Sequence, residues 1–253
     1  MTAVPRRALT DAQDAFGHAV WDHYHRKNAF EIIERSDGRF DISSGPAAYL
    51  ADEPAFWGPQ ERAALEKHAH GRVLDIGCNA GRHTLFLEKH GLEVLGVDVS
   101  PLAIAVAKAR GVKNAEVRSI DELSAELGMF DTLLMLGNNF GLFGSAAKAK
   151  RLLRRFRTLT RPGATLIAES LNVYETKDGD HLAYIAANRE RGRMGGQIRM
   201  RVRYRRFVTP WFDYLLVSPE EMDALLEGTR WKVAQRYQRA GVPVYTSIIE
   251  RVD

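Results

Sequence analysis

The chain has 253 residues, of which 45% are hydrophobic and 27% are charged, a balance typical of a folded globular protein. Its net charge of +4 is modest, so the composition permits acidic partners without requiring nucleic acid. The single cysteine, Cys78, excludes an internal disulfide framework and favours a reducing compartment. No apolar run is long enough to cross a membrane, and no secretion signal follows the N-terminal arginines. We therefore expect a cytoplasmic protein without a membrane partner.

The first part of the chain predicts a helix and a hairpin. Apolar residues recur at helical spacing over 11–27. Two β-type runs, 30–35 and 39–42, flank a two-residue Asp37-Gly38 turn and predict a hairpin. Residues 60–70 predict a further helix. We expect residues 1–71 to form an N-terminal lid segment and residues 72–253 to form the main domain.

A nucleotide-binding βαβ unit begins the main domain. Residues 73–76 predict a buried strand, which runs into a glycine-bearing turn. The turn opens a helix over 83–90, and a second strand over 93–97 ends on Asp98. An acid at that place suits the hydroxyls of a ribose.

The turn itself differs from the type that binds dinucleotides. Such a turn has glycines at its first, third and sixth positions. Here Gly77 occupies the first position, Asn79 the third and Arg82 the sixth, while Gly81 stands at the fifth. An acid, Asp75, precedes the turn. Asparagine tolerates a positive φ better than other residues with side chains, so we expect the turn to form.

Strands and helices then alternate, which predicts an α/β fold with a doubly wound, Rossmann-like sheet. Ser100 caps the next helix, and the predicted strand over 130–136 is apolar throughout, as expected of a buried parallel strand. The predicted elements are a helix over 101–110, a strand over 116–119, the strand over 130–136, a basic helix over 145–160 and a fifth strand over 164–169.

Beyond residue 170 the rhythm changes. A helix is expected over 179–191, and residues 197–205 alternate strictly between arginines and other residues, which predicts a strand with one cationic face. A returning strand over 211–217 completes a β-hairpin insertion, 171–217, placed after strand five. A helix from Ser218 and two strands, 231–237 and 244–250, end the chain.

Two of these motifs resemble those of a known family. Asp75-x-Gly77-x-Asn79-x-Gly81 resembles motif I of the class I, Rossmann-like S-adenosylmethionine (SAM)-dependent methyltransferases of the small-molecule type, and Gly-Val-Asp98-Val-Ser-Pro resembles their motif II. Arg161-Pro162-Gly163, before the fifth strand, is also similar. The resemblance covers 72–170 and 218–252. It implies SAM as cofactor and a seven-stranded sheet of order 3-2-1-4-5-7-6.

The chemistry of SAM suits this turn. Its carboxylate can bind the amide groups at a helix N-terminus. Asp75 offers a counter-charge for its ammonium group, and Asp98 can accept both ribose hydroxyls. By the resemblance Asp121 meets the adenine, with Ser119-Ile120 as the alternative. The residues expected to bind the cofactor are Asp75, Gly77, Asn79, Gly81, Asp98, Val99, Asp121, Leu136 and Asn138.

Methyl transfer is a one-step displacement, for which the enzyme mainly supplies alignment and desolvation. A base is needed only when the acceptor arrives protonated. The candidate bases are His18, His25 and Glu169. No spacing of ligand residues suggests a metal site. The residues expected to contact the acceptor are Trp21, Tyr24, Asn139, Phe140, Arg199 and Arg201.

The arginine row, Arg199 to Arg205, leaves three interpretations open: a solvated hairpin face, a cationic wall for an anionic acceptor, or a nucleic-acid track. Tyr204 falls on the opposite face, whereas a track needs aromatic side chains among its cations. We favour transfer to a small-molecule acceptor, giving S-adenosylhomocysteine. The alternatives are a nucleic-acid methyltransferase and a SAM-binding protein without turnover. The apolar face of the hairpin is also compatible with a homodimer.

Overall fold

The computed structural model describes residues 8–51 and 57–252, so part of the expected lid segment, residues 1–7 and 52–56, lies outside the described residues. The larger of two sheets has the order β11-β12-β7-β6-β3-β4-β5. Counted in chain order within this sheet, the strands read 6-7-5-4-1-2-3, which is the predicted order seen from the other edge. The strands are β3 (Arg72–Ile76), β4 (Glu93–Asp98), β5 (Ala115–Val117), β6 (Phe130–Met135), β7 (Thr160–Leu171), β11 (Trp231–Gln238) and β12 (Val244–Arg251).

The first five of these strands are parallel, whereas β12 runs antiparallel to both β7 and β11. The carboxyl ends of the parallel strands therefore meet at one edge of the sheet, the usual place for a ligand in such folds. Below we call this the carboxyl edge.

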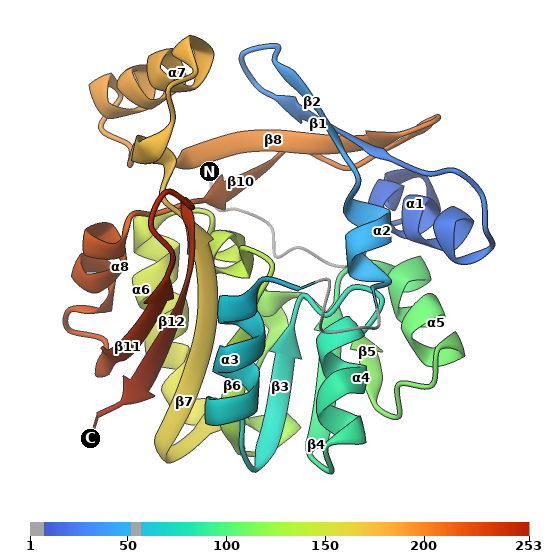
Figure 1. Ribbon diagram of the computed structural model, residues 1–253, viewed down its shortest axis with the longest axis vertical. Helices are drawn as coiled ribbons and strands as arrows, with labels where there is room; N and C mark the ends of the chain where they lie inside the picture. The colour runs from blue at the N-terminus through green and yellow to red at the C-terminus, as the bar shows by residue number, and fades with distance from the viewer. Residues whose placement is uncertain (1–7, 52–56, 253) are drawn as a thin grey trace.

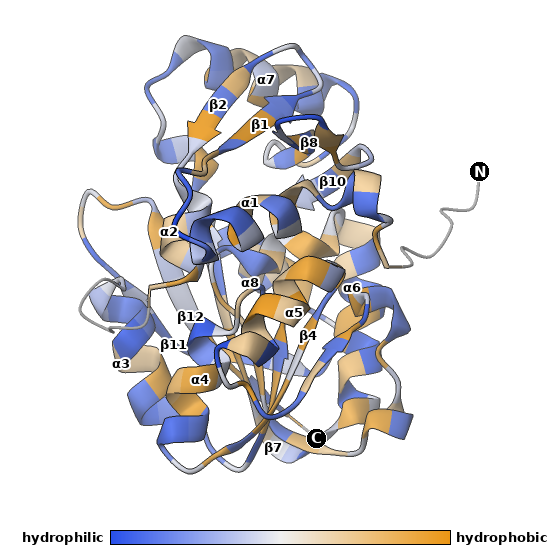
Figure 2. Ribbon diagram, turned by 90° about the vertical axis from the view of Figure 1, so that its right-hand side faces the viewer, coloured by the Kyte–Doolittle hydropathy of each residue, from blue (hydrophilic) through white to orange (hydrophobic). Residues whose placement is uncertain are grey.

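Helices cover both faces of the larger sheet, as a doubly wound fold requires (Figure 1). Successive side chains of a strand point to opposite faces. Val73 accordingly packs with Leu65 and Phe86 on one face, whereas Leu74 packs with Leu153 on the other. The covering helices are α3 (Pro59–His68), α4 (Arg82–Lys89) and α5 (Pro101–Ala109) on the first face, and α6 (Ala146–Phe156) and α8 (Pro219–Leu226) on the second. Hydrophobic residues predominate in α5, one of the covering helices, as Figure 2 shows.

A smaller antiparallel sheet lies above the carboxyl edge (Figure 1), and we call it the upper sheet. Its order is β10-β8-β1-β2, and β9 pairs with β8. The N-terminal hairpin and the insertion after strand five, both predicted, therefore share one sheet, although most of the chain separates them. The strands are β1 (Glu31–Arg35), β2 (Phe40–Ser43), β8 (Gln197–Tyr204), β9 (Phe207–Val208) and β10 (Phe212–Leu215).

Three helices accompany the upper sheet. Asp14 caps α1 by accepting from the Gly17 amide, which breaks the predicted first helix into two pieces. Helix α1 packs Ala15 and Ala19 against the apolar face of the upper sheet. The three are α1 (Ala15–Tyr24), α2 (Gly45–Tyr49) and α7 (Gly179–Glu190). Short 3-10 turns are η1 (Asp11–Gln13), η3 (Ile120–Glu122), η4 (Ala125–Leu127), η5 (Asn139–Phe143), η6 (Arg157–Leu159) and η7 (Val173–Glu175).

Two local expectations were wrong in detail. The β1–β2 turn has three residues rather than two, because Arg35 and Arg39 still pair and Gly38, at φ +94°, provides the left-handed third residue. Strand β7 begins at Thr160, and 161–163 form an irregularity within it rather than a turn before it. No helix among the described residues is long and apolar enough to cross a membrane.

The two halves of the upper sheet are joined by an ion cluster. Glu34 of β1 pairs with Arg201 at 2.6 Å and also with Arg203, both on β8. Its Cα partner in the ladder is Arg201. The Arg201 hydrogen bond, with help from Arg203, lowers the pKa of Glu34 to about 2 against the penalty of burial. This carboxylate therefore stabilises the fold above the pKa of an ordinary glutamate and loses that effect as the pH falls toward 2.

We expect Glu34→Gln to lower the free energy of unfolding by the order of 1–3 kcal/mol at pH 6, and by less at pH 3.5, because at that pH Glu34 is mostly protonated in the unfolded wild-type chain. Urea unfolding at the two pH values measures this. Glu116→Gln, which removes a solvent-exposed partner of Arg118, is the control and should change little. An equal loss at both pH values would contradict the ion-pair account.

Candidate functional site

The predicted motif I turn forms at the end of β3. Gly77, Asn79 and Gly81 all have left-handed backbone angles, with φ of +79°, +48° and +77°, so the expectation that asparagine fits the turn is confirmed. The Gly77 and Cys78 amides donate to the Val97 carbonyl at 2.8 and 3.1 Å. These bonds fix the turn against the end of β4.

The two acids of the motifs flank this turn. Asp98, at the end of β4, accepts from the Asn79 amide at 3.0 Å and from the Ser100 amide at 2.9 Å. Withdrawal from water raises the pKa of Asp98 to about 6, although these amides oppose the shift. Asp75 is 2% exposed and accepts from the Thr84 hydroxyl at 2.7 Å. Burial raises the pKa of Asp75 as well.

Glu169, a predicted base, lies at the same edge near the end of β7. Its Oε1 accepts from the Asn138 amide at 2.9 Å. Burial, and next the charge of Glu61, raise the pKa of Glu169 to about 7. Asn138 has φ +62°, and it follows Leu136, which is buried at the end of β6. The loop after β6 thus brings two predicted cofactor residues beside the predicted base.

The next two predicted residues support this loop from within. The side-chain amide of Asn139 donates to the carbonyls of Ile76 and Gly77 at 3.1 and 3.0 Å, which ties the β6 loop to the motif I turn. Phe140 is fully buried and packs edge-on against Phe143. Both side chains are therefore engaged by the protein itself, although they lie next to the candidate site.

Segments of the upper sheet reach down to this edge. The Tyr214 hydroxyl of β10 donates to the Asn138 carbonyl at 2.7 Å. A Cβ on Gly141 would lie 2.2 Å from the Tyr214 ring, so this close approach needs glycine. Arg110 binds the carbonyls of both Tyr49, in α2, and Ala80, in the motif I turn. Helix α2 is thereby held on the turn.

A buried polar group lies beneath the turn. Glu61 of α3 accepts from Arg82 at 2.6 Å and contacts His83 Nε2 at 2.5 Å. Burial alone would raise the pKa of Glu61. The hydrogen bond and charge of His83, and then the charge of Arg82, outweigh this effect, so the pKa of Glu61 is lowered. Trp57 packs edge-on against the His83 ring. Together these contacts anchor the N-terminus of α4, where the motif I turn ends.

The predicted residues of α1 lie away from this group. His18 stacks on Phe207 with ring centroids 3.4 Å apart and bonds to Asp11 at 3.0 Å. His25 bonds to the Trp21 carbonyl at 2.8 Å. The contacts of His18 and His25 are therefore with α1, η1 and β9, and neither histidine contacts Glu169.

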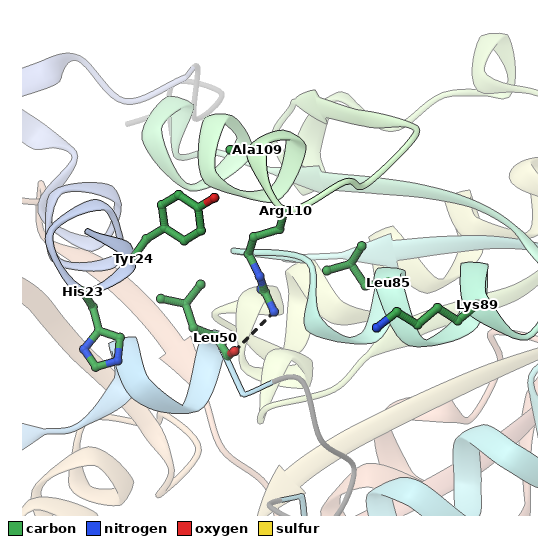
Figure 3. A pocket seen from close by; sticks show the side chains of 7 residues that line it. All are labelled: His23, Tyr24, Leu50, Leu85, Lys89, Ala109 and Arg110. Carbon is green, nitrogen blue, oxygen red and sulfur yellow. Dashed lines mark hydrogen bonds between the residues drawn. The ribbon is translucent and has the colours of Figure 1, made fainter. Parts of the chain in front are cut away.

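Tyr24 instead lines a separate cavity of about 490 Å³ (Figure 3). The cavity lies between α1, α2 and the ends of α4 and α5, and Arg110 crosses it toward the Leu50 carbonyl. None of the predicted cofactor residues lines it. Its walls are His23, Tyr24, Leu50, Leu85, Lys89, Ala109 and Arg110.

The arginine row is paired with acids of the protein itself. Arg201 binds Glu34 and stacks over the Trp211 ring at 4.5 Å, and Arg199 lies 3.7 Å from Asp213. Arg205 pairs with Asp22 at 3.0 Å. These pairs favour the interpretation of the row as a hairpin face.

Two further predicted cofactor residues also have protein partners. The carboxylate of Asp121 binds Lys148 at 2.8 Å and Arg151 at 3.5 Å, both from α6. Val99, next to Asp98, accepts from the Leu9 amide at 3.0 Å, so the N-terminal segment crosses the end of β4. As expected from the sequence, Val99 follows β4 and Asp121 lies in the loop after β5.

Buried acceptors without protein partners at the site leave room for a ligand that donates hydrogen bonds. Asn79 Oδ1, Asn138 Oδ1 and Glu31 Oε1 are buried and have no hydrogen-bond partner. Such atoms are costly unless a ligand or water satisfies them. SAM carries an ammonium, a sulfonium and hydroxyl donors, so the residues present fit it. No group of three or more potential metal ligands occurs within residues 8–51 and 57–252.

Comparison with known proteins agrees with this reading. Residues 73–163 match a family described as "Methyltransferase domain". A SAM-dependent methyltransferase from Bacteroides fragilis, solved with S-adenosylhomocysteine, is 25% identical, with a TM-score of 0.81, and covers 97% of this chain and 98% of its own.

Two curated relatives match over shorter stretches. A ubiquinone biosynthesis O-methyltransferase from Xanthomonas oryzae is 27% identical over 110 residues, which are 41% of this chain and 44% of that protein. A 23S rRNA (uracil(1939)-C(5))-methyltransferase from Shewanella amazonensis is 36% identical over 101 residues, 35% of this chain and 22% of that protein. The chain thus spans less than half the length of the curated relatives it matches.

The matched turn, the strand order and the whole-chain structural likeness assign the fold and the cofactor together. Residues 73–163 form a class I SAM-dependent methyltransferase domain, and the cofactor of that family is SAM.

Three residues at the carboxyl edge were not predicted from the sequence as site residues: Glu31, Tyr49 and Tyr214. No motif contains them. Glu31 and Tyr49 belong to the N-terminal part of the chain, which joins the upper sheet through β8, and Tyr214 lies on β10, the other neighbour of β8. The one usable signal was Gly141, a glycine inside the aromatic loop after strand four. It indicated a close approach by another segment without saying which one.

We expect Glu169→Gln to flatten the pH dependence of stability. Because the pKa of Glu169 is raised in the folded state, its protonated form stabilises the fold. This contribution to the free energy of unfolding is complete below about pH 4.5 and is lost as the pH rises through about 7. Between pH 5 and pH 8 the free energy of unfolding should therefore fall more in wild type than in the variant, by the order of 1–3 kcal/mol.

Urea unfolding at the two pH values measures this difference. Glu175→Gln, at an exposed carboxylate bonded to Asn172, is the control and should follow wild type. Parallel pH dependences in wild type and Glu169→Gln would show that Glu169 does not titrate in this range.

Proposed function

We propose that the protein transfers the methyl group of SAM to a small-molecule acceptor, giving S-adenosylhomocysteine. One observation carries the proposal: four carboxyl groups with raised pKa values, the carboxyl cluster, occur around the motif I turn and α2. They are Glu31, Asp75, Asp98 and Glu169. A desolvated group of acids favours a cationic ligand, because the positive charge offsets the cost of ionising them.

Within the proposal, the chain's own residues divide the cofactor between them. The amides at the N-terminus of α4 hold its carboxylate. Asp98 accepts from the ribose hydroxyls, and Asn79 Oδ1 and Asn138 Oδ1 accept from its remaining donors. Asp75 supplies negative charge beneath them. When bound, the cofactor supplies an electrophilic methyl group on a cationic sulfur.

The upper sheet is proposed to act as a lid that selects the acceptor, formed by the N-terminal segment together with the insertion 171–217. Tyr214 and α2 already reach the carboxyl edge from it. A covered edge suits a small acceptor, because methyl transfer depends on alignment and exclusion of water.

Nucleic acid is the less favoured acceptor. A nucleic-acid track needs free cations along the phosphates, and the arginine row is paired with Glu34, Asp22 and Asp213. The rRNA methyltransferase among the relatives keeps this alternative worth testing.

Transfer of labelled methyl from SAM tests the proposal. The acceptors are catechol, 3,4-dihydroxybenzoate, tyramine, ethanolamine and small thiols, with total RNA and duplex DNA in parallel. We expect label in at least one small molecule, at a rate that changes little between 50 and 300 mM salt. Asp98→Asn should weaken SAM binding, whereas Asp223→Asn, on the exposed face of α8, should not.

Two results would contradict the proposal. Label confined to RNA or DNA, with a steep loss at high salt, would identify a nucleic-acid methyltransferase. SAM binding with no transfer to any acceptor would identify a binding protein without turnover.

A further inference from the structure

Glu31, at the start of β1, carries an oxygen that nothing in the protein satisfies. Its side chain is 1% exposed. Oε2 accepts from the Tyr49 hydroxyl at 3.4 Å, whereas the buried Oε1 has no hydrogen-bond partner. Leaving such an atom unpaired costs stability unless a ligand or a water molecule provides the missing donor.

The Glu31–Tyr49 pair faces the cofactor turn. Tyr49 packs against Ala80 of the motif I turn, and Arg110 binds the carbonyls of both residues. The charges of Asp98 and Tyr214 also act on the Tyr49 hydroxyl. The pair therefore lies over the carboxyl edge, between the upper sheet and the acids of the motifs.

A glycine keeps room for this pair. A Cβ on Gly45, the first residue of α2, would lie 2.6 Å from Glu31 Oε2 and 2.9 Å from the Tyr49 hydroxyl. Gly45 has an ordinary backbone conformation, because its φ is not positive. The absence of a side chain here is thus explained by the close approach of Glu31 and Tyr49, and not by the shape of the turn.

We propose that Glu31 is a catalytic residue that binds the hydroxyl or amino group of the acceptor and takes its proton; this rests on the proposed function. The O–H or N–H bond of the acceptor breaks, the proton moves to Glu31 Oε1, and the electron pair stays on the atom that receives the methyl group. Tyr49 is a positioning residue, since its hydroxyl fixes Oε2 and leaves Oε1 toward the acceptor. The acceptor class is therefore one with an O–H or N–H group, which excludes a thioether.

The electrostatics of Glu31 suit a base that works near neutral pH. Burial raises the pKa of Glu31 to about 8, and the Tyr49 hydrogen bond opposes this only in part. The titratable groups around the pair are Tyr49 itself, with Asp98 of β4 and Tyr214 of β10 beyond it. A base is most effective when its pKa is near the working pH. A nearby cationic sulfur would lower the pKa of Glu31 further toward that range.

The first test needs no acceptor. The carboxyl carbon of Glu31 is followed by ¹³C NMR from pH 5 to pH 9 in protein saturated with SAM or with S-adenosylhomocysteine, and Glu31→Gln assigns the signal. We expect the pKa of Glu31 to be lower with SAM by about one unit or more, because only SAM carries the sulfonium charge. Equal titration in the two complexes would overturn the proposal, since it would place Glu31 away from the reacting centre.

The second test uses whichever panel acceptor the wild-type protein methylates. Glu31→Gln should fold, because glutamine has the shape of the protonated side chain. We expect it to lower kcat about 100-fold or more and to remove the rise of rate with pH. SAM affinity should stay within a factor of two of wild type at pH 6, where the wild-type Glu31 carboxyl is protonated. Tyr49→Phe should shift the pH profile, and Glu66→Gln, at an exposed ion pair on α3, should leave activity unchanged.

These outcomes separate the two proposals. Wild-type rate and pH profile in Glu31→Gln would overturn the assignment of Glu31 while leaving methyl transfer intact. A wild-type protein that methylates nothing in the panel would overturn the proposed function, and the NMR titration would then decide the placement of Glu31 by itself.

Discussion

Withdrawal of carboxyl groups from water at one edge of a parallel sheet is the constraint on which the rest of this structure depends. Asp75, Asp98 and Glu169 are there because parallel strands end together, and folding places Asp75 close enough to Asp98 for their charges to interact. The fold offsets part of the cost with backbone amides, as at Asp98, and with the Asn138 amide at Glu169. What remains favours a cationic, donor-rich ligand, which is the chemistry of SAM.

The upper sheet contacts the same edge of the larger sheet. Its arginines form internal pairs with Glu34 and neighbouring acids, and these pairs hold the sheet together. Its contacts with the larger sheet are made by Tyr214, which binds the loop after β6, and by α2, which is held on the motif I turn. Through these contacts an N-terminal segment and an insertion far along the chain both reach the cofactor turn.

The sequence allowed the larger sheet to be predicted closely, because apolar strands, capped helices and the glycine turn are local signals. The left-handed Asn79 and the Ser100 cap are examples of local chemistry that the structure confirmed. The long-range pairing of β1 with β8 left no such signal, since strand pairing depends on tertiary contacts. For that reason Glu31 and Tyr49 were missed, and arginine alternation suggested a cationic surface whose partner, Glu34, lies more than 160 residues earlier.

The central claim is that the carboxyl cluster binds a cationic cofactor. Calorimetric titration of SAM, S-adenosylhomocysteine and NAD into the wild-type protein at pH 6 and pH 8 tests it most directly. The account predicts that SAM binds more tightly at pH 8, as Asp98 and Glu169 ionise, that S-adenosylhomocysteine gains less, and that NAD does not bind. Equal pH dependence for the two adenosyl ligands, or tight binding of NAD, would contradict it.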